Sequence, residues 1–218
     1  GELVNKLNNT YITAGDVGTS MENLISINKT TKYVSGIKIE TSGPTAKGIF
    51  NAINTTYNFL THKEIKEATI AISGVGKVGS KLAKLLFDKR SKLIVSNIGK
   101  DAIDRLKQEK IFFTETDINL IFEKECDIIS PCALGVTINF ETKKKLKCKA
   151  IVGAANNQLD KPETAIWLKK KKIFYAPDYL VNSGGVIAIS CEINNSENTL
   201  DNQLNNISDK VMALLEES

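Results

Sequence analysis

Apolar and polar positions along the chain fall into alternating blocks that predict helices and buried strands in turn. Apolar residues recur at helical spacing over residues 44–60, beginning with a proline that is well placed in a first helical turn. An unbroken apolar run over 68–73 is typical of a strand covered on both faces. A helical stripe that begins at Val78 and an apolar run over 92–96 come next. The pattern therefore predicts a helix followed by a strand, a helix and a second strand.

The same alternation continues toward the C-terminus. It predicts strands over 111–113, 126–130, 150–152 and 173–175, and helices or helical turns over 102–110, 118–123 and 161–171. Strands that alternate with helices indicate an α/β fold, a doubly wound, Rossmann-like parallel sheet with helices on both faces. A polar stretch over 194–206 then precedes the start of another helix over 207–215.

Three glycines lie where the strand over 68–73 gives way to the next helix. They match the pattern G-x-G-x-x-G, in which the first glycine permits a tight turn, the second lets the backbone approach a pyrophosphate and the third lets helix and strand pack closely. Free N–H groups at the helix start bind the anion. The motif alone is common, but this context favours a dinucleotide site over a turn without a ligand. The candidate cofactor residues are Gly74, Val75, Gly76, Lys77, Val78 and Gly79.

The end of the second strand departs from the usual pattern. An acidic residue about 20 residues beyond the glycines commonly binds the adenosine ribose, but this chain has Asn97, followed by Ile98. An amide can still bond a ribose hydroxyl, yet it lacks the charge-assisted acceptor and the repulsion that would exclude a 2′-phosphate. We expect NAD as the cofactor, with NADP not excluded. Lys100 is near enough in sequence to meet a phosphate, although a solvated lysine is the simpler interpretation.

Composition narrows the classes of partner. The 218 residues are 42% hydrophobic with a net charge of +4, which is enough chain for one large domain. The basic runs over 143–149 and 169–172 follow helical segments without interleaved aromatics, so we expect solvated helix ends and no nucleic-acid partner. The lone His62 has no partner at metal-ligand spacing, so no metal site is expected.

Localisation is predicted from what the sequence lacks. It has no apolar run long enough to span a bilayer and no apolar stretch of a signal peptide at its polar start. We therefore expect a cytoplasmic protein without a membrane partner. The cysteines have no short paired spacing and are interpreted as reduced thiols; they are Cys126, Cys132, Cys148 and Cys191.

Four further segments, spread over most of the chain, carry a family resemblance. They are YITAGDVGT over 11–19, CDIISPCALG over 126–135, AANNQL over 154–159 and APDYLVNSGGV over 176–186. Together they closely resemble the leucine dehydrogenase branch of the glutamate/leucine/phenylalanine/valine amino-acid dehydrogenases. The resemblance implies NAD-dependent oxidative deamination of a branched-chain, leucine-like L-amino acid to the 2-oxo acid and ammonia. It also implies a homo-oligomer.

The resemblance assigns roles to residues outside the glycine turn. Asp16 matches the aspartate that handles protons at the imino carbon, although its neighbours alone would favour a turn cap. Thr45 matches a threonine near the nicotinamide carboxamide. Asn182 matches the asparagine that meets the substrate or the nicotinamide, and Val186 would form part of the side-chain pocket. The residues that match the lining of the cofactor and the loop beside the nicotinamide ribose are Cys132, Ala133, Leu134, Ala155 and Asn156, with Asn157 adjacent.

The chain also departs from this family. Gly15 stands where an acidic residue is usual, Val136 stands where a glycine is common, and the loop between Gly36 and Pro44 is short. The family's substrate lobe, which carries the lysines that polarise the carbonyl and clamp the carboxylate, is expected to precede Gly1.

These departures define the expected organisation. Residues 1–43 are expected to be a remnant that joins a missing substrate lobe, 44–193 the dinucleotide-binding domain, and 194–218 the start of a C-terminal helical segment that is cut off. The chain would be an NAD(P)-dependent enzyme only when joined to that lobe. The alternative is a catalytically inactive nucleotide-binding or subunit-interaction protein derived from the same family.

Overall fold

The structure is a computed structural model that describes residues 1–16 and 18–218. Its strands are β1 (Thr69–Ser73), β2 (Lys92–Ser96), β3 (Thr114–Glu115), β4 (Ile128–Pro131), β5 (Ala150–Ile151) and β6 (Phe174–Tyr175). Its α-helices are α1 (Glu2–Lys6), α2 (Met21–Asn28), α3 (Ser42–Thr61), α4 (Lys77–Asp88), α5 (Lys100–Gln108), α6 (Pro162–Lys170), α7 (Asp178–Val181), α8 (Gly184–Ile193) and α9 (Leu200–Glu216). Short 3-10 helices are η1 (Ile65–Glu67), η2 (Ile121–Glu123), η3 (Lys143–Lys145) and η4 (Glu197–Thr199).

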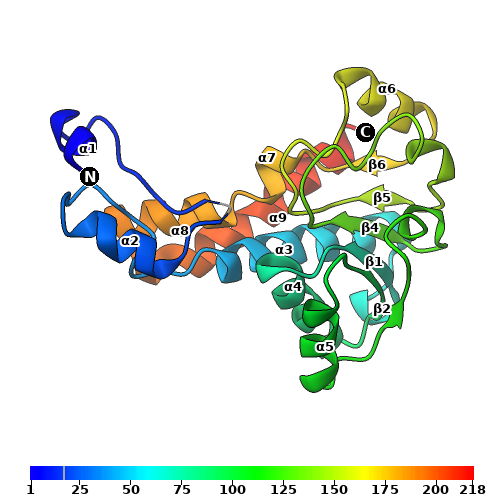
Figure 1. The fold of residues 1–218 in the computed structure, drawn as a ribbon. Helices are drawn as coiled ribbons and strands as arrows, with labels where there is room; N and C mark the ends of the chain where they lie inside the picture. Colours follow the sequence, from blue (N-terminus) through cyan, green and yellow to red (C-terminus); the bar gives the residue numbers. More distant parts are fainter. Residues whose placement is uncertain (17) are drawn as a thin grey trace.

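The molecule is elongated, with the sheet at one end and the two short N-terminal helices α1 and α2 at the other (Figure 1). Helices α3, α8 and α9 run between these ends (Figure 1). Val17, which belongs to the family-like segment 11–19, lies outside the described residues. Within the part of the chain that is described, no helix is both long and apolar enough to cross a membrane.

The six strands are all parallel and lie in the order β3-β2-β1-β4-β5-β6. The chain moves outward from β1 through β2 to β3, and then crosses back to place β4 on the other side of β1. The reversal falls between β1 and β4, and open α/β sheets bind ligands beyond the carboxyl ends of the strands at such a point. The predicted fold class, a doubly wound, Rossmann-like parallel sheet, is confirmed.

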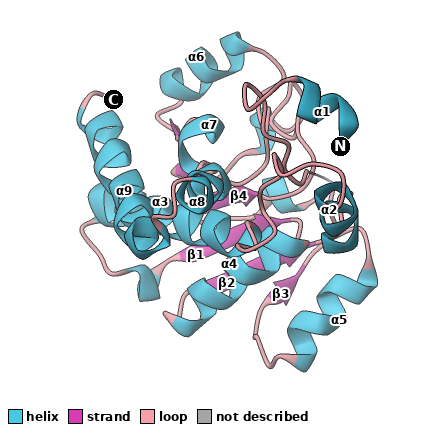
Figure 2. Cartoon of the chain, turned by 90° about the vertical axis from the view of Figure 1, so that its left-hand side faces the viewer, coloured by secondary structure: helices cyan, strands magenta, loops and turns pink. Residues whose placement is uncertain are grey.

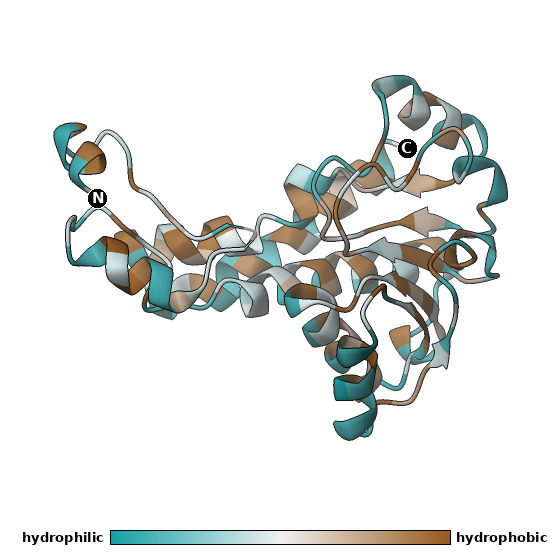
Figure 3. Cartoon of the chain, viewed as in Figure 1, coloured by the Kyte–Doolittle hydropathy of each residue, from teal (hydrophilic) through white to brown (hydrophobic). Residues whose placement is uncertain are grey.

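Successive residues of the strands enter two apolar cores on opposite faces of the sheet. In β1, Ile70 and Ile72 pack into the core formed with α3, α4, α5 and α9, whereas Ala71 enters the core beneath η2 and α6. Ile128 and Ile129 of β4 divide in the same way. Burial of an isoleucine side chain contributes about 1.5–3 kcal/mol to stability. Figure 2 shows helices around the sheet, and Figure 3 shows apolar residues concentrated along the strands and central helices.

Most predicted elements lie close to their predicted places, but the strand predicted over 111–113 is wrong. The Ile111 N–H donates to the Leu106 carbonyl at 3.0 Å, so this segment closes the end of α5 instead. The neighbouring Phe112 is 77% exposed. The strand β3 therefore begins only at Thr114.

The C-terminal helices extend beyond the predicted stretch. Helix α9 begins at Leu200, because Leu204 and Ile207 bury one side of it while the polar residues between them face outward. Helix α8 was not predicted, and its buried residues Ala188 and Cys191 stabilise it despite two glycines in its first turn.

A buried carboxylate ties the N-terminal segment to α8. Glu192 of α8 is 9% exposed, and its Oε2 accepts hydrogen bonds from the N–H groups of Gly36 and Ile39, both at 3.2 Å. A parallel bridge between Thr13 and Val34 joins two parts of the same segment. The N-terminal segment is thus anchored immediately before α3 begins.

The first turn of α3 is held by a second carboxylate, Glu40. Its Oε1 accepts from the Ser42 N–H at 3.2 Å and from the Ser42 hydroxyl, and its Oε2 accepts from the Gly43 N–H at 3.3 Å. Lys81 of α4 pairs with Oε2 as well. Burial would raise the pKa of Glu40, but the bonds from Lys81 and Ser42 and the Lys81 charge together lower it to about 2. Glu40 therefore links the starts of α3 and α4.

The contacts of Glu40 predict how its contribution to the stability of the fold depends on pH. The folded pKa of Glu40 lies below its ordinary value of 4.5, so its stabilising contribution is complete above pH 4.5 and is lost as pH falls toward 2. Lys81→Met should raise the pKa of Glu40 and shift this loss to higher pH. Carbon-13 NMR titration of the Glu40 carboxyl measures the change, with Lys84→Met as the matched control; an unchanged pKa in Lys81→Met would contradict the assignment.

Candidate functional site

The first glycine of the motif is required by the turn itself. Gly74 has a φ of +95°, a conformation that L side chains rarely adopt. A Cβ at this position would lie 2.8 Å from the backbone nitrogen of Ala133, on the neighbouring strand end. The Gly74 N–H donates to the Ser96 carbonyl at 2.8 Å, which extends the β1–β2 ladder into the turn. Packing and backbone geometry both exclude a side chain here.

The other two glycines have different roles. A Cβ on Gly79 would lie 2.0 Å from the carbonyl oxygen of Gly74, so only glycine lets α4 pack this closely on the strand end. A Cβ on Gly76 would meet no atom of the described residues within 4 Å. Gly76 is exposed and precedes α4 without a side-chain hydrogen bond that caps the helix. The protein's own packing thus explains Gly74 and Gly79 but leaves open space beside Gly76, where a pyrophosphate could approach the helix N–H groups.

The predicted ribose residue braces the turn. Asn97 Oδ1 accepts a hydrogen bond from the Val75 N–H at 2.9 Å, and Asn97 Nδ2 donates to the Gly99 carbonyl at 2.8 Å. Val75 is fully buried, whereas Ile98 is 86% exposed. Lys77 is exposed at the start of α4, and Val78 packs against the larger core.

The end of β4 lies beside the glycine turn. The Cys132 N–H donates to the Ser73 carbonyl at 2.8 Å, which places Ala133 beside Gly74. Burial raises the pKa of the Cys132 thiol, so this group stays protonated at neutral pH. Leu134 is 76% exposed at this edge of the sheet. A neutral thiol and an exposed leucine make this strand end apolar.

Asparagines join the loop after β5 to α7 and the residue that follows it. Asn182 Nδ2 donates to Asn156 Oδ1 and, at 3.3 Å, to the Ala154 carbonyl. The Asn157 N–H donates to Asp178 Oδ2 at 2.5 Å. Ala155 is buried beneath this loop. The structure therefore brings together Asn156 and Asn182, which are 26 residues apart in sequence.

The start of α3 reaches the same region. A Cβ on Gly184 would lie 2.3 Å from the Pro44 carbonyl, and one on Gly185 would lie 2.9 Å from Thr45 Oγ1. Thr45 is therefore adjacent to the first turn of α8, which begins two residues after Asn182. Val186 of this turn is 71% exposed.

Asp16 lies in an exposed turn of the N-terminal segment. Its N–H donates to Thr19 Oγ1 at 3.1 Å, and the Thr19 N–H donates to the Asp16 carbonyl at 2.9 Å. These two bonds join the backbone of Asp16 to Thr19. The role of the Asp16 carboxylate in proton transfer stays a prediction.

One departure from the family pattern is visible as backbone strain. Val136 has a φ of +58°, in the left-handed region where a β-branched residue is a genuine outlier. Its N–H donates to the Asn157 carbonyl at 2.7 Å, so the strained residue is tied to the asparagine loop. A glycine, which the family pattern favours at this position, would adopt this conformation without strain.

Two residues that position the site carried no assigned role from sequence. Asp178 holds the Asn157 N–H, and Gln158, fully buried, donates from Nε2 to the carbonyls of Gly153 and Ala155 at 2.8 and 3.0 Å. Both lie within family-like segments, which was the only signal available. Their hydrogen bonds depend on the path of the loop, which local sequence does not specify.

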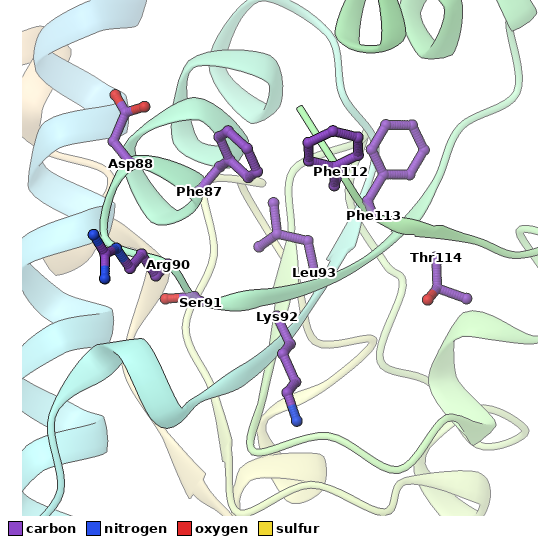
Figure 4. Close-up of a pocket in the computed structure, with 9 residues that line it drawn as sticks. All are labelled: Phe87, Asp88, Arg90, Ser91, Lys92, Leu93, Phe112, Phe113 and Thr114. Carbon is purple, nitrogen blue, oxygen red and sulfur yellow. The ribbon is translucent and has the colours of Figure 1, made fainter. Parts of the chain in front are cut away.

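A separate hollow lies away from the glycine turn. A cavity of about 740 Å³ is bordered by the end of α4, the start of β2 and the residues before β3. Figure 4 shows Phe87, Phe112 and Phe113 among the residues that line it, and the ring centroids of Phe87 and Phe112 are 5.8 Å apart. These are the amino ends of the strands, opposite the glycine turn. Across residues 1–16 and 18–218, no group of three or more His, Cys, Asp or Glu side chains is arranged to hold a metal ion.

The sequence is similar to one family profile and to individual amino-acid dehydrogenases. The sequence profile described as Glutamate/Leucine/Phenylalanine/Valine dehydrogenase matches residues 89–217. Leucine dehydrogenase of Thermoactinomyces intermedius is 38% identical over 226 residues, covering 99% of this chain and 61% of that protein. Phenylalanine dehydrogenase of the same organism is 37% identical over 203 residues, covering 88% of this chain and 55% of that protein.

A solved structure extends this similarity to the fold. The crystal structure of L-tryptophan dehydrogenase from Nostoc punctiforme superposes with a TM-score of 0.85 at 31% identity, covering 99% of this chain and 64% of that one. The chain thus spans a little more than half the length of the relatives it matches.

The glycine turn yields a test of its packing. Gly79→Ala should destabilise the fold by about 3 kcal/mol or more, because the new methyl would overlap a backbone oxygen that cannot move without shifting the strand. Gly76→Ala is the matched control and should change stability by about 1 kcal/mol or less. Urea unfolding followed by circular dichroism measures the free energy of unfolding of both variants. Equal losses of stability would contradict the proposed close packing at Gly79.

Proposed function

Since the chain belongs to the glutamate/leucine/phenylalanine/valine dehydrogenase family, we propose that it supplies the nicotinamide-dinucleotide domain of an L-amino-acid dehydrogenase. The proposed cofactor is NAD, and the proposed reaction is oxidative deamination of a branched-chain, leucine-like amino acid to its 2-oxo acid and ammonia. We also propose that the natural protein is a homo-oligomer. The observation that carries the proposal is the open space beside Gly76 at the start of α4.

The pyrophosphate would bind at the glycine turn. The first N–H groups of α4 point out of the helix end. The preceding residue, Gly76, has no side chain that could cap them. The positive end of the helix dipole and Lys77 add attraction for the two phosphates. Val75, fixed by Asn97, holds the turn in place for this contact.

The nicotinamide end would lie toward Asn156, Asn182 and Thr45. When bound, the nicotinamide accepts the hydride that leaves the amino-acid α-carbon. The Asn182 amide already bonds Asn156 and the Ala154 carbonyl, so its position is set before any ligand arrives. The Thr45 hydroxyl, which donates to the Thr41 carbonyl at 2.9 Å, has acceptor capacity for the carboxamide. Cys132 and Leu134 would cover the cofactor and exclude water.

The substrate end involves fewer residues of this chain. In the proposed role, the Asp16 carboxylate accepts a proton from the substrate amino group or from the attacking water. Val186, exposed on the first turn of α8, would contact an aliphatic substrate side chain. Catalysis further requires the lysine-bearing segment that the family resemblance implies, because a cation must stabilise charge on the reacting oxygen.

Cofactor binding is tested directly on this chain. Gly76→Ala should weaken NADH binding by about tenfold or more, because the new methyl occupies the space of the pyrophosphate while the fold stays intact. The matched control is Gly43→Ala in the first turn of α3, where a Cβ meets nothing nearer than 3.9 Å. Calorimetric titration with NADH measures both. Unchanged affinity in Gly76→Ala, or no NADH binding by the folded chain, would refute the proposed site.

Turnover separates the proposed enzyme from the non-catalytic alternative. The natural polypeptide that contains this sequence should reduce NAD with leucine, valine or isoleucine, followed as NADH absorbance. The three substrates should differ modestly, since one methylene in an apolar pocket is worth about 1–3 kcal/mol. NADH binding without turnover on any amino acid would favour the nucleotide-binding or subunit-interaction alternative.

A further inference from the structure

Two of the four cysteines lie in register on neighbouring segments of the sheet. Strands β4 and β5 pair in parallel from their first residues onward, and an isolated parallel bridge joins Glu125 to Lys147 just before them. Cys126 and Cys148 are the residues that directly follow this bridge. Because parallel strands pair residue by residue, these two cysteines lie opposite each other.

The two side chains also enter the same side of the sheet. Both are partly buried and pack against the core beneath η2 and α6. The residues directly after them, Asp127 and Lys149, form an ion pair between the same two segments, so the register is kept beyond the cysteines. The thiols of Cys126 and Cys148 are therefore neighbours within one layer of side chains.

The spacing of the two segments permits a bond between these thiols. Adjacent strands lie about 4.7–4.9 Å apart, and disulfides join Cα atoms that are about 4.4–6.8 Å apart. The Cβ atoms of a disulfide must approach to about 3.5–4.5 Å, which is slightly less than the strand spacing. Since Cys126 and Cys148 precede the regular strands, the backbone has to tighten only where the β4–β5 pair starts. A bond formed in this way would carry some strain and be easily reduced.

One of these thiols borders a space that a small molecule can enter. A hollow of about 510 Å³ at the amino ends of β1 and β4 is lined in part by Cys126. Cys132, by contrast, lies at the opposite, carboxyl end of β4, and Cys191 is buried in α8. A disulfide reagent can therefore reach Cys126, and Cys148 is the thiol placed to complete the exchange.

We propose that Cys126 and Cys148 form a reversible redox site, a dithiol that a low-molecular-weight disulfide converts to an intramolecular disulfide. The Cys126 thiolate attacks one sulfur of the reagent, which forms a mixed disulfide and releases one thiolate. The Cys148 thiolate then attacks the Cys126 sulfur and displaces the second thiolate. The protons of both cysteines end on the two released thiols, so the cysteines are oxidised and the reagent is reduced.

The surroundings of the two thiols determine the rate of this exchange. Burial raises the pKa of both, to about 12 for Cys148, and the neighbouring Cys148 raises the pKa of Cys126 further. Thiolates are therefore scarce at neutral pH, and the exchange is slow. The bond would close residues 126–148 into a covalent loop, and its formation requires no cofactor, so the inference does not depend on the proposed function.

Intact-mass spectrometry and peptide mapping test the site on the folded 218-residue chain, incubated with oxidised glutathione until the masses stop changing. The chain should lose two hydrogen atoms without retaining glutathione, and digestion should yield one pair of peptides joined through Cys126 and Cys148. Excess reduced glutathione should restore the dithiol. Cys126→Ser and Cys148→Ser should each abolish the bond, whereas the matched control Cys191→Ser should still form it. Circular dichroism checks that each variant is folded.

The peptide map decides between the outcomes. A pair joined through Cys126 and Cys148, which reduced glutathione separates, supports the inference. Glutathione adducts alone, a link between other cysteines or no oxidation at the end point overturns it. A bond that persists in excess reduced glutathione overturns the reversibility that the strand spacing implies. Because the unsubstituted chain gives this map, the result stands even where a serine variant fails to fold.

Discussion

The close approach of α4 to the end of β1 is the constraint on which the rest of the structure depends. The position that a Cβ of Gly79 would take lies 2.0 Å from the Gly74 carbonyl oxygen, so helix and strand are nearly in backbone contact. This contact places the start of α4 at the carboxyl end of β1 and leaves Gly76 bordering open space. In the proposed site, the N–H groups at the start of α4 would bind the anion beside Gly76.

Around this contact the chain assembles a site from segments that are distant in sequence. Asn97 ties the end of β2 to the turn, and the end of β4 reaches it where Ala133 packs beside Gly74. Asn182, directly after α7, connects this part of the chain to the loop after β5. Each connection is a hydrogen bond or a close backbone contact within the chain itself. Such preorganisation lowers the entropy that cofactor binding must overcome.

The polar anchors outside this site determine where the N-terminal segment lies. Glu192 accepts two backbone hydrogen bonds just before α3, and Glu40 joins the starts of α3 and α4. Both carboxylates act on backbone N–H groups that would otherwise lack an acceptor within secondary structure. The first turn of α3, with Thr45, is consequently held against the first turn of α8. The proposed substrate and nicotinamide contacts depend on this placement more than on any single side chain.

The amino-acid sequence by itself determined the parallel α/β fold and the glycine turn, because apolar periodicity and the conformational freedom of Gly74 are local properties. It also indicated the segments that hold Asn156 and Asn182. Only the tertiary structure decided which glycine borders open space, that Asn97 braces Val75, and that Glu192 anchors residues more than 150 positions away. The prediction of a strand over 111–113 was wrong for a related reason. The Ile111 N–H donates to the Leu106 carbonyl at the end of α5 and is therefore not part of the sheet. Packing and backbone hydrogen bonding between distant segments settle these points, and no local pattern encodes them.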